Sequence, residues 1–216
     1  MKLKTVILIC CLVVLNSCIV KSLQPFYTTE SIAYQKDFVG KWIDNKKHTW
    51  EVISFKKAFL EENKTSKISE EDKAIFEKYK EGYFVALTKK DEESVFLTMP
   101  FIVDGQLFMD FIPFNYEDLT DDLVSQHLLN THSVAKIDKE ENNLKITWLD
   151  EDRLKDLFKK DLLKLKHETV GFDESFVLTA SSEELHRFLK KYINSNIENK
   201  WESSEKFILT KVNAQP

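Results

Sequence analysis

The chain has 216 residues, and 43% of them are hydrophobic, including 16 phenylalanines and 4 tryptophans. This supply is large enough for a packed core and excludes an intrinsically disordered chain. Acidic residues outnumber basic ones by 36 to 31, which disfavours nonspecific nucleic-acid binding, because such binding depends on neutralising phosphates with lysine and arginine.

The first 17 residues have the layout of a secretory signal peptide. Lys2 and Lys4 give a basic start, and an apolar run follows from residue 5 to residue 15. This run is too short for a membrane-spanning helix, which needs about 20 residues. The three cysteines, Cys10, Cys11 and Cys18, all lie in the first 18 residues, so the rest of the chain has no thiol for a disulfide, a metal site or a nucleophile.

Leu15-Asn16-Ser17-Cys18 resembles the lipobox of bacterial lipoproteins, in which an aliphatic and a small residue precede a cysteine. The resemblance covers residues 1–18. It implies cleavage after Ser17, a diacylglyceryl thioether on Cys18 and acylation of the new amine, with palmitate as the expected fatty acid. The alternatives are an ordinary signal peptide cut nearby and an uncleaved anchor. Because no aspartate follows directly after the cysteine, the resemblance implies secretion across the inner membrane and anchoring at the periplasmic face of the outer membrane.

Residues 18–36 are predicted to form a lipid-anchored tether, because they are few and mostly polar, and residues 37–216 to form a single domain. Apolar or alternating runs predict strands at 37–43, 49–55, 83–88, 94–103, 106–114, 134–137, 144–149, 176–179 and 206–212. Helical spacing predicts helices within 58–81, 117–129, 151–165 and 182–195.

Short-range signals support several of these elements. Asp104-Gly105 lies between two apolar runs and predicts a tight hairpin, because a type I′ turn needs positive φ at both positions. Ser69 is expected to cap one helix, and Ser181 with Glu184 to form a capping box at another. Together the elements predict an α+β fold with a mainly antiparallel sheet, open or closed like a barrel, and two or three inserted helices.

Gly40-Lys41-Trp42 resembles the G-x-W motif of the lipocalins, in which the tryptophan packs across the floor of a barrel. The late helix followed by a last strand is similar to the end of that fold. Three features depart from it. The family's T-D-Y turn is absent, with Thr120-Asp121-Asp122 as the nearest match; the last strand has no arginine to stack on Trp42; and a helix at 151–165 would interrupt an eight-strand meander.

No motif in the chain specifies a reaction. The histidines form no H-E-x-x-H, and the serines form neither G-x-S-x-G nor S-x-x-K. We therefore predict no catalytic residue, no cofactor and no metal, and favour a non-catalytic function. The alternative is an envelope hydrolase with an unrecognised site, for which His127, His132 and Asp110 are the first residues to locate in a structure.

The aromatic residues on predicted strands are the remaining candidates. They either fill a core or line an apolar cavity. A cavity would be lined by Trp42, Trp50, Phe96, Phe108, Phe111 and Trp148. The sequence thus predicts an envelope lipoprotein that is held to the membrane by a lipid on Cys18. Its domain is predicted to be a ligand-binding or protein-interaction module, with an apolar small molecule or an envelope protein as the partner. No binding of nucleic acid is predicted.

Overall fold

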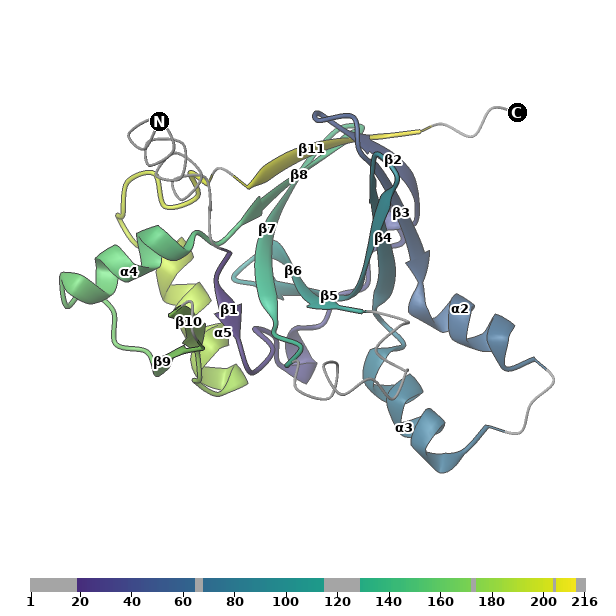
Figure 1. Ribbon diagram of the computed structural model, residues 1–216, viewed down its shortest axis with the longest axis horizontal. Helices are drawn as coiled ribbons and strands as arrows, with labels where there is room; N and C mark the ends of the chain where they lie inside the picture. The colour runs from purple at the N-terminus through teal and green to yellow at the C-terminus, as the bar shows by residue number, and fades with distance from the viewer. Residues whose placement is uncertain (1–18, 65–67, 115–128, 172–173, 204, 213–216) are drawn as a thin grey trace, which may run out of the picture.

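The computed structural model describes residues 19–64, 68–114, 129–171, 174–203 and 205–212. Its centre is a closed antiparallel barrel in the strand order β11-β2-β3-β4-β5-β6-β7-β8 (Figure 1). The strands are β2 (Gly40–Asp44), β3 (Thr49–Ser54), β4 (Tyr83–Lys89), β5 (Glu92–Val103), β6 (Gln106–Pro113), β7 (Ser133–Glu140), β8 (Asn143–Trp148) and β11 (Lys206–Lys211). The predicted α+β fold with an antiparallel, barrel-like sheet is confirmed.

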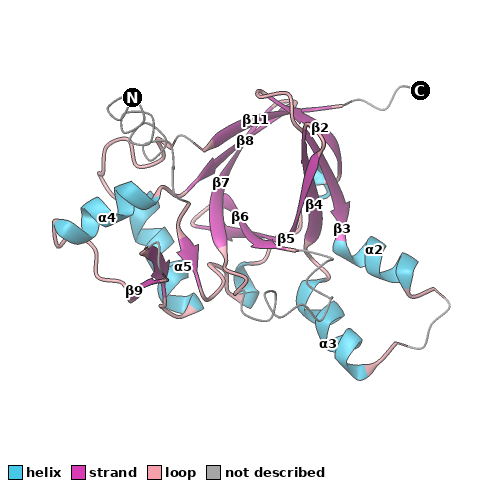
Figure 2. Ribbon diagram, viewed as in Figure 1, coloured by secondary structure: helices cyan, strands magenta, loops and turns pink. Residues whose placement is uncertain are grey.

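Two groups of helices flank the barrel on opposite sides (Figure 2). On one side, α2 (Phe55–Glu62) and α3 (Glu70–Tyr79) connect β3 to β4. On the other side lie α4 (Glu151–Lys159), α5 (Ser182–Ile193) and a small sheet of β1 (Lys21–Ser22), β10 (Ser175–Leu178) and β9 (His167–Val170).

All of the second group except β1 is inserted between β8 and β11, so β2 to β8 still follow one another around the barrel and β11 closes it. A helix after β8 therefore does not interrupt the meander, although the sequence suggested that it would. The helix predicted at 117–129 lies almost entirely outside the described residues.

The predictions that rest on local chemistry are confirmed. The Ser69 side chain accepts a hydrogen bond from the Asp72 N–H, and Ser181 forms a capping box with Glu184. Asp104 and Gly105 have φ angles of 51° and 81°, as a type I′ turn between β5 and β6 requires.

Alternation along the barrel strands separates two apolar clusters. On β6, Met109 and Phe111 belong to the cluster inside the barrel, whereas Phe108 belongs to the cluster outside it. The outer cluster fills the space between β5–β7 and the layer formed by α4, α5 and the small sheet. One barrel wall is therefore buried on both faces, which explains why its strands are apolar throughout.

The described part of the folded body includes residues from Ile19 onward, within the range 18–36 that the sequence predicts as a tether. β1 pairs with β10 in parallel, and Val20 and Phe26 are fully buried in the outer cluster. The backbone N–H of Phe26 also donates to the Asp110 carboxylate at 2.9 Å. The apolar residues of this segment follow neither a strand nor a helix period, so its composition resembled a linker. We call residues 19–34 the N-terminal strap.

Because the strap is part of the core, Phe26→Ala should destabilise the protein by about 3–5 kcal/mol, the usual cost of removing a buried ring. Leu23→Ala is the control, since Leu23 belongs to the same segment but is 38% exposed. Urea unfolding of both variants measures the difference. Equal, small effects for the two variants would instead support a loose tether.

Candidate functional site

The interior of the barrel is filled by aromatic rings that contact one another. Ring centroids of Trp148 lie 5.1 Å from Phe111, 5.7 Å from Phe207 and 6.4 Å from Trp50. Trp50 and Phe207 are 5.3 Å apart in an edge-on arrangement. These are the separations of packed aromatic pairs, each contributing about 0.5–1.5 kcal/mol beyond burial. The rings pack against one another as a core inside the barrel.

The six residues predicted to line a cavity do not all face the barrel interior. Trp42, Trp50, Phe111 and Trp148 are buried in the interior cluster, and Phe96 packs against it. Phe108 points the other way. Its ring lies 5.6 Å from Phe101 and 5.7 Å from Trp201, outside the barrel.

Trp42 is held from two sides at the end of the barrel where β2 begins. Its indole N–H donates to the Phe38 carbonyl at 2.8 Å, and the Lys211 ammonium lies 5.0 Å from its ring centroid. The last strand has no arginine, and Lys211 supplies a cation over the ring instead. The same ammonium donates to the Asp37 carbonyl at 2.8 Å, which ties β11 to the segment before β2.

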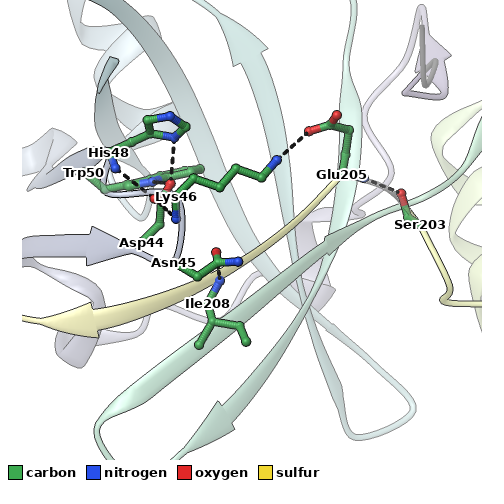
Figure 3. Close-up of polar contacts among 8 residues, drawn as sticks. All are labelled: Asp44, Asn45, Lys46, His48, Trp50, Ser203, Glu205 and Ile208. Atoms are coloured by element: carbon green, nitrogen blue, oxygen red, sulfur yellow. Dashed lines mark hydrogen bonds and ion pairs between the residues drawn. The ribbon is translucent and has the colours of Figure 1, made fainter. Parts of the chain in front are cut away.

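A buried carboxylate closes the opposite end of the barrel. Asp44 accepts hydrogen bonds from the Trp50 indole N–H and from the backbone N–H groups of Lys46 and His48, at 2.8–2.9 Å (Figure 3). The His48 Nδ1 lies 3.0 Å from the same carboxylate. Burial favours the neutral acid, but these hydrogen bonds outweigh burial and hold the pKa of Asp44 below its ordinary value. With both oxygens engaged, Asp44 acts as a structural clamp.

Two of the three residues named for a hydrolase lie together. Asp110 Oδ1 and His132 Nδ1 are 2.6 Å apart, and His127 lies outside the described residues. Asp110 is 1% exposed, and burial raises the pKa of its carboxyl, while His132 and the Phe26 N–H act in the opposite direction. The Ser22 backbone pairs with His132, but the Ser22 hydroxyl is buried and donates to the Leu178 carbonyl at 3.4 Å. The pair therefore fastens the N-terminal strap to the barrel.

An open groove lies outside the barrel, between α5 and the segment that connects α4 to β9. Its volume is about 1120 Å³, which is slightly above the usual range of about 300–1,000 Å³ for small-molecule sites. The side chains that line it include an apolar set: Leu157, Phe158, Leu162, Leu163, Leu165, Phe188, Tyr192 and Ile197. We call it the α4–α5 groove. Leu162, one of these lining residues, is 68% exposed.

The charge along the α4–α5 groove is opposite to that of the whole chain. Lys159, Lys164, Lys166, Arg187 and Lys191 line it together with two acidic residues, Asp161 and Glu184. The chain as a whole has an acidic excess. Hydrogen bonding to the Ser181 N–H holds the pKa of Glu184 below its ordinary value, so this carboxylate is already engaged in capping α5.

The wall of this groove was predicted as the end of a helix. The leucine spacing favoured a helix over 151–165, but α4 ends at Lys159 and Asp161 has a φ of 55°. A left-handed residue stops a right-handed helix. The leucines that follow, Leu162, Leu163 and Leu165, consequently line the groove. No local pattern in the sequence distinguishes them from leucines of a longer helix.

Three further findings bear on the site. Within the described ranges, no helix is long and apolar enough to cross a membrane, and no three histidine, cysteine or acidic side chains gather as a metal site would require. Cys18 lies outside these ranges. Comparison with protein-family models, with curated proteins and with solved structures finds no match to the chain.

The Asp44 clamp predicts a specific pH dependence. A carboxyl whose pKa is lowered by folding contributes stability above its unfolded pKa and loses it as the pH falls through the folded pKa. Asp44→Asn should lower the free energy of unfolding by about 2–3 kcal/mol at pH 7. The NH₂ group of the new side chain would face N–H donors that the carboxylate now accepts from. The cost should shrink as the pH falls below about 4.

Urea unfolding of wild type and Asp44→Asn between pH 2 and pH 7 measures this. Asp152→Asn, at an exposed position, is the matched control and should shift stability by less than about 1 kcal/mol. A constant gap between wild type and Asp44→Asn across this range would contradict the lowered pKa.

Proposed function

We propose that this chain is a lipid-anchored protein of the bacterial cell envelope whose folded body is a non-catalytic binding module. The observation that carries the binding part is the contrast between a barrel filled by its own aromatic rings and an open, apolar groove outside it. In this proposal the α4–α5 groove is the binding surface, and the barrel is the scaffold that holds it.

The rigidity of the groove's surroundings supports this proposal. Phe188 and Tyr192 of α5 are buried against the outer cluster, and the Tyr192 hydroxyl donates to the Lys200 carbonyl at 2.7 Å. A site built on a helix packed against a barrel wall is preformed, so little ordering entropy is lost on binding.

The anchor part of the proposal rests on the leader and on Cys18. The strap places the first described residue, Ile19, in a bridge with Asp150, the residue that caps α4. With no free linker between them, a lipid on Cys18 would hold the body directly against the membrane. The module would then work at a fixed orientation relative to the bilayer.

Metabolic labelling with an alkyne palmitate tests the anchor. Wild type should carry the label and Cys18→Ser should lose it, because the thioether and the acylated amine both require Cys18. The double variant Cys10→Ser/Cys11→Ser should keep the label, since these cysteines lie in the removed leader. Label on Cys18→Ser, or none on wild type, would refute the anchor.

Native mass spectrometry of the protein isolated from its own envelope tests the binding part. We expect an additional mass that disappears on denaturation. Leu162→Ser should reduce the bound fraction, because this exposed leucine contributes about 1–2 kcal/mol of apolar contact to an occupant of the groove. Val170→Ser, at a position 46% exposed outside the groove, is the control. An adduct equally abundant in both variants would place the binding site elsewhere.

A further inference from the structure

Resting on the proposed binding function, we propose that the α4–α5 groove takes an amphiphile with an anionic headgroup, drawn from the membrane to which the chain is anchored. In this assignment the acyl chain lies on the leucines and Phe188, and the headgroup binds to the basic side chains along the groove.

The ion pairs of the protein itself favour an anion in this position. Within the described part of the chain, no carboxylate forms an ion pair with Lys159, Lys166, Arg187 or Lys191. Asp161 lies 3.7 Å from Lys164, and Glu184 is engaged at the start of α5. Glu184 also interacts electrostatically with Lys166 and Arg187. Five basic residues still line the groove against two acidic ones, so a net positive charge remains for a ligand. A surface with a local excess of positive charge attracts anions even in a protein that is acidic as a whole.

The apolar lining explains why a small anion alone would not suffice. Leu157 and Phe188 are buried in the floor, and Leu162 is exposed at the edge. Each methylene that an acyl chain buries there contributes about 0.8 kcal/mol. A chain of modest length therefore adds more than the exposed cations do, since single surface charge pairs contribute about 0–1 kcal/mol.

The position of the groove relative to the anchor identifies the source. Ile19 directly follows Cys18 and pairs with Asp150, and the Val20 N–H donates to the Leu149 carbonyl at 3.2 Å. From Asp150, α4 runs towards the groove, and its nine residues span about 14 Å. The groove wall thus begins within about one helix length of Ile19, the residue that follows Cys18. Lipids of the same bilayer are the amphiphiles at the highest local concentration there.

Titration calorimetry with submicellar lysolipids tests this proposal. The sample is the mature chain from residue 18 onward with Cys18→Ser, which contains every described residue and has no lipid of its own. The probes are palmitoyl-lysophosphatidylglycerol, which is anionic, and palmitoyl-lysophosphatidylcholine, which has the same chain and no net charge. We expect one site, with the anionic lysolipid bound at least tenfold more tightly.

The charge-reversal variant Arg187→Glu/Lys191→Glu should weaken binding of the anionic probe at least tenfold. Lys56→Glu/Lys57→Glu on α2 makes the same change in net charge on the far side of the barrel and should leave the affinity within twofold (Figure 1). Circular dichroism confirms that both variants are folded. Inorganic phosphate should compete weakly, because it lacks the acyl chain.

Three results would overturn the proposal: equal affinity for the two lysolipids, equal loss in the two charge-reversal variants, or no lipid binding while an acidic amphipathic peptide binds. The last result would assign the groove to a protein partner. None of these results affects palmitate labelling of Cys18 or the presence of an adduct in native mass spectra. These results can therefore disprove the proposed class of ligand without disproving the proposal of a lipid-anchored binding module.

Discussion

Four rings, from Trp50, Phe111, Trp148 and Phe207, pack against one another inside the barrel and determine what the rest of the protein can do. Hydrophobic burial on this scale stabilises the closed sheet, because each ring removes a large apolar area from water. It also occupies the space in which a barrel would otherwise hold a ligand. We therefore place the proposed recognition surface outside the barrel, on the insertion between β8 and β11.

The packing of the inserted layer against the barrel also depends on a buried polar group, the Asp110 carboxylate. Asp110 is buried on the outer face of β6, where it accepts the Phe26 N–H and contacts His132. An unpaired carboxylate in such a position would be costly, so its partners must remain in place. The N-terminal strap is thereby fixed beneath the helical layer, and β1 extends the small sheet that borders α4 and α5. The strap, the small sheet and the groove form one continuous unit.

Much of the barrel could be predicted from sequence because its signals are local. The alternation of Leu144, Ile146 and Trp148, the Asp104-Gly105 turn and the Ser181 capping box each depend on a few neighbouring residues. The face of the sheet on which each aromatic side chain lies is harder to predict from sequence, because strands buried on both faces show no alternation of apolar and polar residues. Phe108 was therefore grouped with the interior residues, although it lies outside. The strap and the groove depend on contacts between distant segments, and no local period marks them.

The central claim is that ligands bind in the α4–α5 groove and not inside the barrel. Hydrogen–deuterium exchange of the mature chain with and without palmitoyl-lysophosphatidylglycerol tests it most directly. We expect slower exchange in residues 157–166 and 184–197 and unchanged exchange in β6 and β8, because a bound ligand would cover and stabilise only the groove segments. Slower exchange confined to β6 and β8, with the groove segments unchanged, would place the ligand in the barrel and contradict the account.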